Sequence, residues 1–368
     1  MLIHKSKKLI HTAILLLITL MMVIISGCGS AGTANSPSAA EESTAKPTAA
    51  GAQDPVKASE LPKEIRIGYQ VSPNGELLAK ALGLAEKRFP DVKVSWLKFD
   101  SGRDVNVAMA AGGIDLGLVG TPPGASGIAQ GLPYQIYYIH DVIGESEALV
   151  VKNNSGIQSL QDLKGKTIAT TFGSTSHFSL LSALKQENVD PKEVKIIDMQ
   201  APDLLAAWQR GDIVGGFTWQ PVQSKLLAND GKVIITSKQI ADKGALTGEF
   251  GVVRKDFVSK YPEVVKGYIA VLDEASNYYI DHPKEASEAL SKELGLSPEE
   301  SLKAMKEIIV LNAADQTNAK YMGTKDNPGE FAKLLKATAD FLVEQKAITK
   351  SPEISIYQEA IRNDLYQK

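Results

Sequence analysis

The stretch "AMAAGGIDLGLVGTPP" (108–123) is echoed 99 residues later by "AWQRGDIVGGFTWQPV" (207–222). In both, a predicted helix ends at a glycine, a strand starts with isoleucine, and a proline follows. Glycine suits the end of a helix, and proline suits the first turn of the next one. Two βα units can share this pattern by coincidence, but the alternative, two similar α/β lobes, is favoured by the strands around them. The paired positions are Gly112 and Gly211, Ile114 and Ile213, and Pro122 and Pro221.

Strand-like and helix-like segments alternate from Glu64 onward in two series, one for each predicted lobe. Alternation of this kind indicates mainly parallel sheets covered by helices on both faces. Beyond "FGVVRKDF" (250–257) the chain turns mostly helical. The predicted strands are 64–70, 91–99, 114–120 and 134–139 in the first series, with helices at 76–88 and 103–111, and 166–172, 194–200, 213–219 and 232–236 in the second, with helices near 176–187 and 202–210.

The residues that follow these strands are the first site candidates. Ligands of open α/β sheets bind beyond the carboxyl ends of the strands. Two facing lobes therefore direct those ends into one shared cleft. The candidates are Tyr69 and Gln70, Gly120 and Thr121, residues 172–175, Gln200, and Trp219 with Gln220.

Hydroxyl side chains follow two of the strands, in "TFGSTSHFSLLSAL" (171–184) and "VGTPPGAS" (119–126). Ser174 or Thr175 is placed to cap the first of the following helices, and Thr121 to cap the second. Free N–H groups at a helix N-terminus attract anions, so two such ends in one cleft favour an anionic ligand group. The plainer alternative is that these side chains only cap their helices.

Two glutamates stand at the predicted crossings between the lobes. Glu147 heads the apolar strand in "GESEALVVK" (144–152), and Glu249 heads a similar strand in "LTGEFGVVRKDF" (246–257). Each alone is typical of a solvated charge at a strand end, but a pair at the two crossings is suited to hold an ammonium group. Trp219, at the end of a strand, either packs in the core or forms a wall for the methylene groups of a ligand.

The first 28 residues have the features of a secretory leader. A segment with three lysines precedes an apolar run at 13–25, which is long enough for a signal peptide and short for a membrane span. The sequence "ISGC" (25–28) resembles the bacterial lipobox, in which the cysteine receives a diacylglycerol and becomes the first residue after cleavage. We expect residues 1–27 to be removed and Cys28 to anchor the protein on the extracytoplasmic face of the cell membrane. A lone cysteine is otherwise usually a small buried hydrophobe.

Residues 28–61 form a predicted tether between the lipid and the folded part. The segment is rich in Ala, Ser, Thr, Pro and Gly, and Val56 is the one large aliphatic residue between Gly29 and Glu60. Such a segment cannot bury a core, so we expect a flexible linker. The folded part starts near Pro62.

Composition and motifs argue against several classes of protein. Loss of the leader moves the net charge from −3 to about −6, which gives no attraction for nucleic acid. Cys28 is the only cysteine, so no disulfide forms within the chain. No HExxH, CxxC, GxSxG or P-loop motif is present, and no metal or cofactor is predicted. A serine nucleophile is not excluded, but nothing in the sequence marks one, so we predict a binding protein and not an enzyme.

Several blocks between about Glu64 and Tyr261 together resemble the family of taurine-binding periplasmic proteins of ABC importers. The resemblance implies a type II periplasmic-binding-protein-like α/β fold, with two lobes joined by a two-crossing hinge and the ligand in the cleft between them. The implied lobes are 62–150 with 248–345, and 151–247, followed by a C-terminal segment at 346–368. The blocks are "KFDSG" (98–102), "SEALVVK" (146–152), "SLLSALK" (179–185), "AAWQRGDI" (206–213), "DGKV" (230–233) and "VVRKDF" (252–257).

The resemblance also implies a function and partners. A monomer would capture taurine outside the cytoplasm and hand it, through hinge closure, to the permease and ATPase subunits of an ABC importer. Another alkanesulfonate, a nitrate-like anion or a thiamine-pyrimidine-like solute stay open as ligands, and an enzyme on the same scaffold is the alternative from another class. A ligand without a cation would leave the two glutamates unpaired in a closed cleft, which argues against nitrate.

Residue roles follow from the resemblance where the motifs align. They put the sulfonate against Thr121, Ser174, Thr175 and His177, the amine near Glu147 and Glu249, and Gln70 and Trp219 along the cleft. The chain also departs from the family pattern. Aspartate is expected where Glu249 stands and tryptophan where Gly251 stands, and Val214 and Gln220 replace a usual Asp and Ala.

Overall fold

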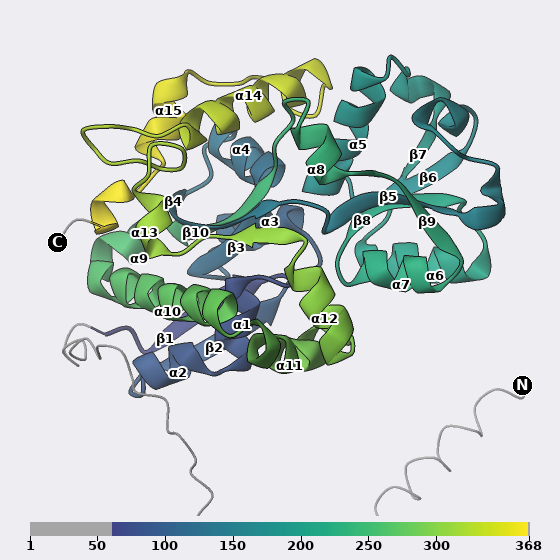
Figure 1. Ribbon diagram of the computed structural model, residues 1–368. Coiled ribbons are helices and arrows are strands. Elements are labelled where there is room, and N and C mark those ends of the chain that lie inside the picture. Colours follow the sequence, from purple (N-terminus) through teal and green to yellow (C-terminus); the bar gives the residue numbers. More distant parts are fainter. Residues whose placement is uncertain (1–60, 367–368) are drawn as a thin grey trace, which may run out of the picture. The chain divides into compact units, whose positions relative to one another are not determined.

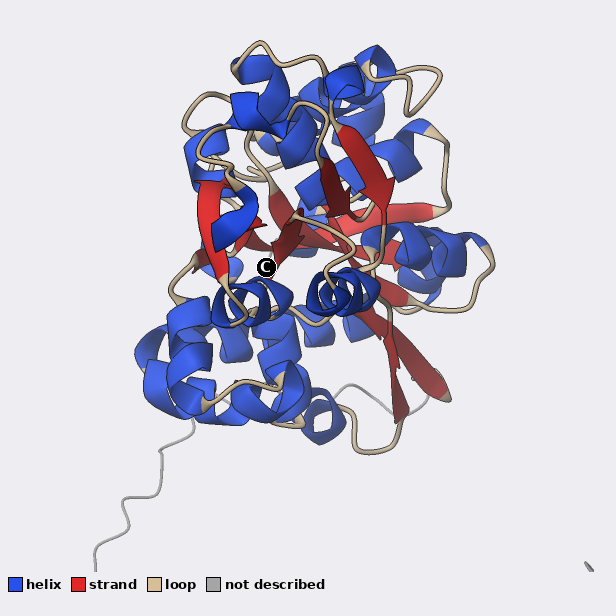
Figure 2. Cartoon of the chain, turned by 90° about the vertical axis from the view of Figure 1, so that its right-hand side faces the viewer, coloured by secondary structure: helices blue, strands red, loops and turns tan. Residues whose placement is uncertain are grey.

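The computed structural model describes residues 61–366, which fold around two β-sheets that lie side by side (Figure 1). We call the part built on the six-stranded sheet lobe 1 and the part built on the five-stranded sheet lobe 2. Helices surround the strands of both sheets (Figure 2). The arrangement is the two-lobed α/β architecture that the sequence predicts.

Lobe 1 contains the first strands of the described chain and its C-terminal helices. Its strands are ordered β11-β4-β10-β3-β1-β2. They are β1 (Glu64–Tyr69), β2 (Lys93–Lys98), β3 (Leu116–Gly120), β4 (Tyr134–Ile143), β10 (Gly248–Arg254) and β11 (Ile308–Val310). The helices are α1 (Gly75–Ala81), α2 (Leu84–Arg88), α3 (Gly102–Ala110), α4 (Thr121–Ala129), α9 (Lys255–Lys260), α10 (Pro262–Asp281), α11 (Pro283–Leu294), α12 (Pro298–Met305), α13 (Ala313–Gln316), α14 (Phe331–Glu344) and α15 (Ile354–Glu359).

Lobe 2 is formed by the middle of the chain. Its strands are ordered β7-β6-β8-β5-β9. They are β5 (Glu147–Lys152), β6 (Thr167–Thr170), β7 (Lys195–Asp198), β8 (Gly215–Trp219) and β9 (Gly231–Thr236). The helices are α5 (Thr175–Gln186), α6 (Ala201–Arg210), α7 (Val222–Ala228) and α8 (Ser237–Ala241).

Within each lobe, the strand that arrives from the other lobe runs against its neighbours. In lobe 1, β1 pairs in parallel with β2 and β3, whereas β10 pairs antiparallel with β3 and β4. In lobe 2, β6 pairs in parallel with β7 and β8, whereas β5 pairs antiparallel with β8 and β9. The expectation of mainly parallel sheets is therefore wrong. Both sheets are mixed, because each crossing inserts a strand of opposite direction between parallel ones.

The strand β5 shows why the sheets are stable with both faces covered. Its side chains alternate between two hydrophobic cores: Leu149 and Val151 pack with α5 and α8, and Ala148 and Val150 pack with α6 and α7. Successive side chains of a strand point to opposite faces, so a continuous apolar run is what two covered faces require. Burial of each larger aliphatic side chain stabilises the fold by about 1.5–3 kcal/mol.

The two echoed stretches occupy equivalent places in the two lobes. Gly112 follows α3 and Gly211 caps α6, with φ angles of 68° and 83°, a region that favours glycine. The strands that follow, β3 and β8, both lie inside their sheets. Pro122 lies in the first turn of α4, and Pro221 directly precedes α7. The echo thus corresponds to the same βα unit in each lobe.

The chain crosses between the lobes at residues 144–146 and again just before β10. The predicted boundary at residue 150 falls inside β5, but the pairing of this strand places all of it in lobe 2. The C-terminal segment joins lobe 1, because Ile361 forms a parallel bridge with Ile136 of β4 and Tyr357 is fully buried.

Within residues 61–366, no helix is long and apolar enough to span a membrane. The predicted leader, the Cys28 anchor and nearly all of the tether lie outside the described residues.

Candidate ligand-binding site

The candidate site lies where strand ends of the two lobes meet. Gly120, the last residue of β3, pairs with Glu249 on β10, and Glu147, the first residue of β5, pairs with Trp219 at the end of β8. Gly120 approaches lobe 2 so closely that a Cβ atom on it would collide with the methyl group of Thr175. Strand pairing and lobe contact therefore bring both groups of predicted residues into one region.

Glu147 is buried, with 3% of its surface exposed. The Thr175 hydroxyl donates a hydrogen bond to its Oε1, and Ser237 Oγ donates to its Oε2 at 3.4 Å. Burial raises the pKa of Glu147 to about 7, against the hydrogen bond from Thr175 and with help from the nearby charge of Glu249. The partners of this carboxyl are hydroxyl groups, which leave its charge unneutralised.

Glu249 is half-buried near the start of β10. Asn74 Nδ2 donates to its Oε2 at 2.8 Å, while Asn74 Oδ1 caps helix α1 by accepting from the backbone N–H of Leu77. Burial raises the pKa of Glu249, and the hydrogen bond from Asn74 opposes the shift. The second crossing therefore supplies a carboxyl that is oriented by the first helix of lobe 1.

Two more buried carboxyls adjoin Glu249, and the sequence did not single them out. Asp141 on β4 pairs with Glu249 across the sheet and is 1% exposed; burial and then the charge of Glu249 raise its pKa well above the usual range. Glu76, fully buried in the first turn of α1, accepts a hydrogen bond from the Tyr268 hydroxyl at 3.1 Å, and burial raises its pKa to about 8. We call these two residues, with Glu147 and Glu249, the carboxyl end of the site.

The carboxyl end has no cationic partner within residues 61–366. None of its four members forms an ion pair with lysine or arginine. His140 Nε2 lies 3.9 Å from Glu76 Oε1, but burial lowers the pKa of His140 to about 3, so the imidazole is neutral at pH 7. An uncompensated group of carboxyls in a buried site favours a cationic ligand group.

The hydroxyl end of the site is formed by Thr121, Ser174 and Thr175. Ser174 caps α5 as predicted, since its Oγ accepts from the backbone N–H of His177 at 3.2 Å. Thr175 does not cap, because its hydroxyl proton goes to Glu147. The prediction that Thr121 caps α4 is wrong: Gly120 is the N-cap and Thr121 is the first helical residue. The Thr121 hydroxyl is fully buried and has no hydrogen-bond partner in the described part of the chain.

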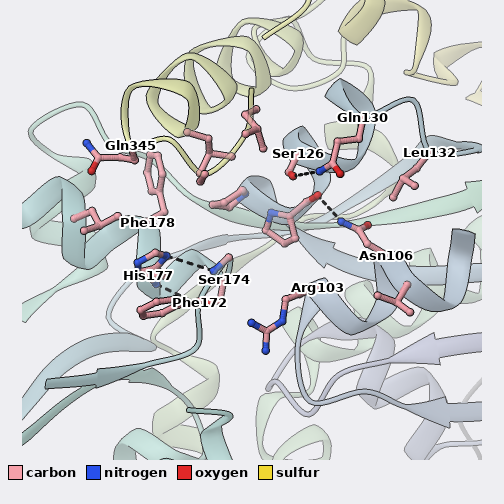
Figure 3. Close-up of a pocket in the computed structure, with 18 of the residues that line it drawn as sticks. Arg103, Asn106, Ser126, Gln130, Leu132, Phe172, Ser174, His177, Phe178 and Gln345 are labelled. Atoms are coloured by element: carbon pink, nitrogen blue, oxygen red, sulfur yellow. Dashed lines mark hydrogen bonds between the residues drawn. The ribbon is translucent and has the colours of Figure 1, made fainter. Parts of the chain in front are cut away.

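A cavity of about 670 Å³ opens beside Ser174 and His177 (Figure 3). Phe172 and His177 stack there with ring centroids 4.4 Å apart, and burial lowers the pKa of His177 to about 4, so this ring is neutral at pH 7. Its Nδ1 accepts from the backbone N–H of Gly173 at 3.3 Å. Glu147 and Glu249 do not line this cavity. Ser174 is thus the member of the hydroxyl end that borders this cavity, whereas Thr121 and Thr175 do not line it.

Gln70 and Trp219, the two predicted cleft-lining residues, are both engaged by their own lobes. Gln70 is buried, and its Nε2 donates to the carbonyl oxygen of Leu118 at 2.9 Å. Trp219 is partly buried and packs against the core that α6 and α7 cover, which is the core contact that the sequence left open. Gly251, where tryptophan is expected, faces Tyr137: a Cβ atom there would lie 2.5 Å from Tyr137 Cζ.

Polar contacts join the lobes on one side of the site. Arg103 of α3 forms an ion pair with Asp198 at the end of β7, at 2.9 Å. Gln200 Nε2 donates to Asp104 Oδ2, also at 2.9 Å. Over residues 61–366, no group of three or more His, Cys, Asp or Glu side chains is arranged to hold a metal ion.

Comparison with known proteins assigns the chain to a family. The profile described as NMT1/THI5 like matches residues 89–286, which is more than half of the chain. The protein belongs to the NMT1/THI5-like family. This family member is 41% identical over 219 residues to the taurine-binding periplasmic protein of Escherichia coli (strain K12), a match that covers 60% of the chain and 67% of that relative. The resemblance predicted from the sequence blocks is confirmed.

Solved structures confirm the fold class of this NMT1/THI5-like protein. The alkanesulfonate-binding protein SsuA from Xanthomonas axonopodis pv. citri, bound to MOPS, superposes with a TM-score of 0.68 at 23% identity, covering 82% of this chain and 98% of that one. The periplasmic aliphatic sulphonate binding protein SsuA from Escherichia coli gives a TM-score of 0.66 at 27% identity, covering 81% and 92%. The type II periplasmic-binding-protein-like fold is therefore shared along nearly the whole length of both.

Proposed function

We propose that this NMT1/THI5-like protein captures taurine outside the cytoplasm and delivers it to an ABC permease. The observation that carries the proposal is the junction of two opposite environments: carboxyls that have no basic partner among residues 61–366, and the N-termini of α4 and α5. The carboxyl end suits an ammonium group, and helix N-termini with a buried hydroxyl suit a sulfonate. Taurine carries both groups on one short spacer.

The relatives support the same chemistry. One is named as a taurine-binding protein, and the two structural neighbours are named as alkanesulfonate- and sulphonate-binding proteins. The inference that the ligand carries a cationic group comes from this chain's own residues. Glu147 and Glu249 belong to different crossings and are close enough for the charge of one to affect the other. Another alkanesulfonate without an amine, or a nitrate-like anion, would leave these carboxyls facing each other unpaired. A thiamine-pyrimidine-like solute would leave the hydroxyl end without its anion.

The small size of taurine makes closure of the lobes part of the proposal. Micromolar binding requires about −8 kcal/mol. A ligand of about seven heavy atoms gains at most roughly −1.5 kcal/mol per atom, so nearly every atom must be contacted. Neither lobe alone can do this, since Thr121 and Glu249 come from lobe 1 and Glu147 and Thr175 from lobe 2. Hinge motion at the two crossings would open and close the site.

A binding protein predicts saturation without turnover. We expect calorimetric titration to give one taurine bound per chain, with sulfate and nitrate much weaker. Mass balance after long incubation should return the taurine unchanged. Tight binding of nitrate with no heat from taurine would overturn the proposal, and release of sulfite or an aldehyde would favour an enzyme on this scaffold.

We also propose that Cys28 carries the lipid anchor, as the lipobox-like sequence indicates. The folded part begins about thirty residues later, so Cys28→Ala should release the protein from the membrane fraction and leave its affinity for taurine unchanged. Cell fractionation and calorimetry measure the two effects separately. Retention of the variant in the membrane fraction would contradict the anchor.

A further inference from the structure

The pair formed by Asp141 and Glu249 has an arrangement that requires a proton. The two residues face each other across β4 and β10, and Asp141 is 1% exposed. No N–H or O–H group of the described residues donates a hydrogen bond to either oxygen of Asp141. Its neighbour across the sheet is another acid, Glu249, and neither Asp141 oxygen has a hydrogen-bond partner among the described residues. A buried carboxylate with neither a hydrogen bond nor a cation costs so much free energy that the carboxyl holds a proton instead.

Among residues 61–366, no positive charge faces the pair that would remove this need. Asp141 is faced by Glu249 from β10, by Glu147 from β5 and by Tyr279 from α10. Glu249 is faced in addition by Glu76 from α1. The neighbour of Glu76 on β4 is His140, which is neutral at pH 7. All the titratable groups around the pair are therefore acidic or neutral.

We propose that a cationic ligand group entering this site displaces a proton from the Asp141–Glu249 pair, so that Asp141 sets the pH range of ligand capture. The positive charge of the taurine ammonium group replaces that of the proton on the pair, and the proton leaves to solvent. The identity of the cation rests on the function proposed above, whereas the proton on Asp141 does not. The sequence gives Asp141 no such role.

The direction of proton flow separates this account from its alternative. A cation near the carboxyls favours their ionised forms, so binding releases protons and strengthens as the pH rises from 6 to 8. If instead the neutral carboxylic acids donated hydrogen bonds to an anion, binding would take protons up and weaken over the same range. The raised pKa values of Asp141 and Glu147 fit either direction, so the sign must be measured.

The first test is calorimetry of the full folded chain with taurine at pH 7, in two buffers of different ionisation enthalpy. We expect release of about one proton per taurine, falling by about half or more in Asp141→Asn, with the remainder from Glu147. The matched control is Asp91→Asn, an exposed aspartate in a turn, which should leave the count unchanged. No release, uptake of protons, or the same count in Asp141→Asn would overturn the proposal.

The second test needs no ligand and separates this proposal from the assignment of taurine. A carboxyl whose pKa is higher in the folded state than in the unfolded chain makes the free energy of unfolding depend on pH. The fold loses stability as the pH rises from the unfolded-state pKa to the folded-state pKa. Relative to Asp141→Asn, the wild type should therefore lose up to about tenfold in its folding equilibrium constant per pH unit between pH 5 and 8. Asp91→Asn should run parallel to the wild type. If the pH dependence of stability were the same in Asp141→Asn and the wild type, the proposal would be overturned even if taurine binds. If the two pH dependences diverge, they support a proton on Asp141 even if taurine does not bind.

Discussion

The carboxyl end and the hydroxyl end of the candidate site are built in opposite ways. The hydroxyl end arises locally, where a strand turns into a helix: Ser174 caps α5 within four residues of chain, and Thr121 begins α4 directly after β3. The carboxyl end is assembled from three distant stretches of the sequence, and only strand pairing brings Asp141 to Glu249. A local turn can attract many anions, so the long-range group of carboxyls should decide which anion is accepted.

The largest expected effect is a loss of affinity for taurine, but not for ethanesulfonate, when the carboxyl end is changed. Glu147→Gln removes one charge from the carboxyl end and keeps its shape. Because a charge-assisted hydrogen bond contributes about 1.5–3 kcal/mol, taurine affinity should fall about tenfold to a hundredfold. Ethanesulfonate, which has no amine, should bind equally well or better. Glu145→Gln, at the same crossing and exposed, is the matched control. Equal losses for both ligands would mean that Glu147 supports the crossing and not an amine.

The contact between the lobes should affect both ends alike. Gly120→Ala puts a Cβ atom into the methyl group of Thr175, so the lobes must move apart or the strand must shift. Overpacking of this kind costs about 1–3 kcal/mol, and taurine and ethanesulfonate should weaken together. Gly113→Ala is the control, since its Cβ atom would lie 3.4 Å from the nearest atom, the carbonyl oxygen of Ala108. Unchanged affinity in Gly120→Ala, measured by calorimetry, would show that binding does not need this contact.

A smaller loss of ligand affinity should follow when the hydroxyl end is changed. Thr121→Val replaces the buried, unpartnered hydroxyl by a methyl group of similar size. Backbone N–H groups remain, so both sulfonates should weaken by only about 0.5–2 kcal/mol. Thr167→Val, at the opposite end of β6 from the site, is the matched control. If taurine alone weakened, Thr121 would belong with the carboxyl end.

The smallest effect on ligand affinity is expected at the exposed polar contacts between the lobes. Arg103 and Asp198 form an exposed ion pair between the lobes, with about two fifths of each side chain accessible (42% and 40%). Exposed pairs contribute about 0–1 kcal/mol and are screened by salt. Arg103→Ala should therefore reduce affinity for both ligands slightly at low ionic strength and not at high. A hundredfold loss of affinity would instead indicate that Arg103 contacts the ligand directly.

Much of the fold follows from local signals, and the exceptions have physical causes. The strands of both series appear within a few residues of their predicted places, because apolar runs between turn residues are short-range patterns. The predicted helix at 76–88 is divided into α1 and α2 at Gly83, which has a φ angle of 64°. The antiparallel insertion of β5 and β10 depends on how the chain returns between lobes, and no local pattern encodes that.

The site divides along the same line. Ser174 could be placed as a cap because capping is read from neighbouring residues. Asp141 was missed because the predicted strand ended at residue 139, so an acid inside the longer strand β4 looked like part of a loop. Glu76 resembled an ordinary acidic residue in the first turn of a helix. The signal available for both was a charged residue within a run of otherwise buried positions, and burial becomes visible only in three dimensions.

The most direct test of the account is the affinity of the wild-type protein for taurine and for its two halves, ethanesulfonate and ethylammonium, measured by calorimetry in one buffer at pH 7. If both ends of the site bind, taurine should be tighter than ethanesulfonate by about tenfold to a hundredfold, and ethylammonium alone should be weakest. Ethanesulfonate binding as tightly as taurine would contradict the account, because the carboxyl end would then contribute nothing to recognition.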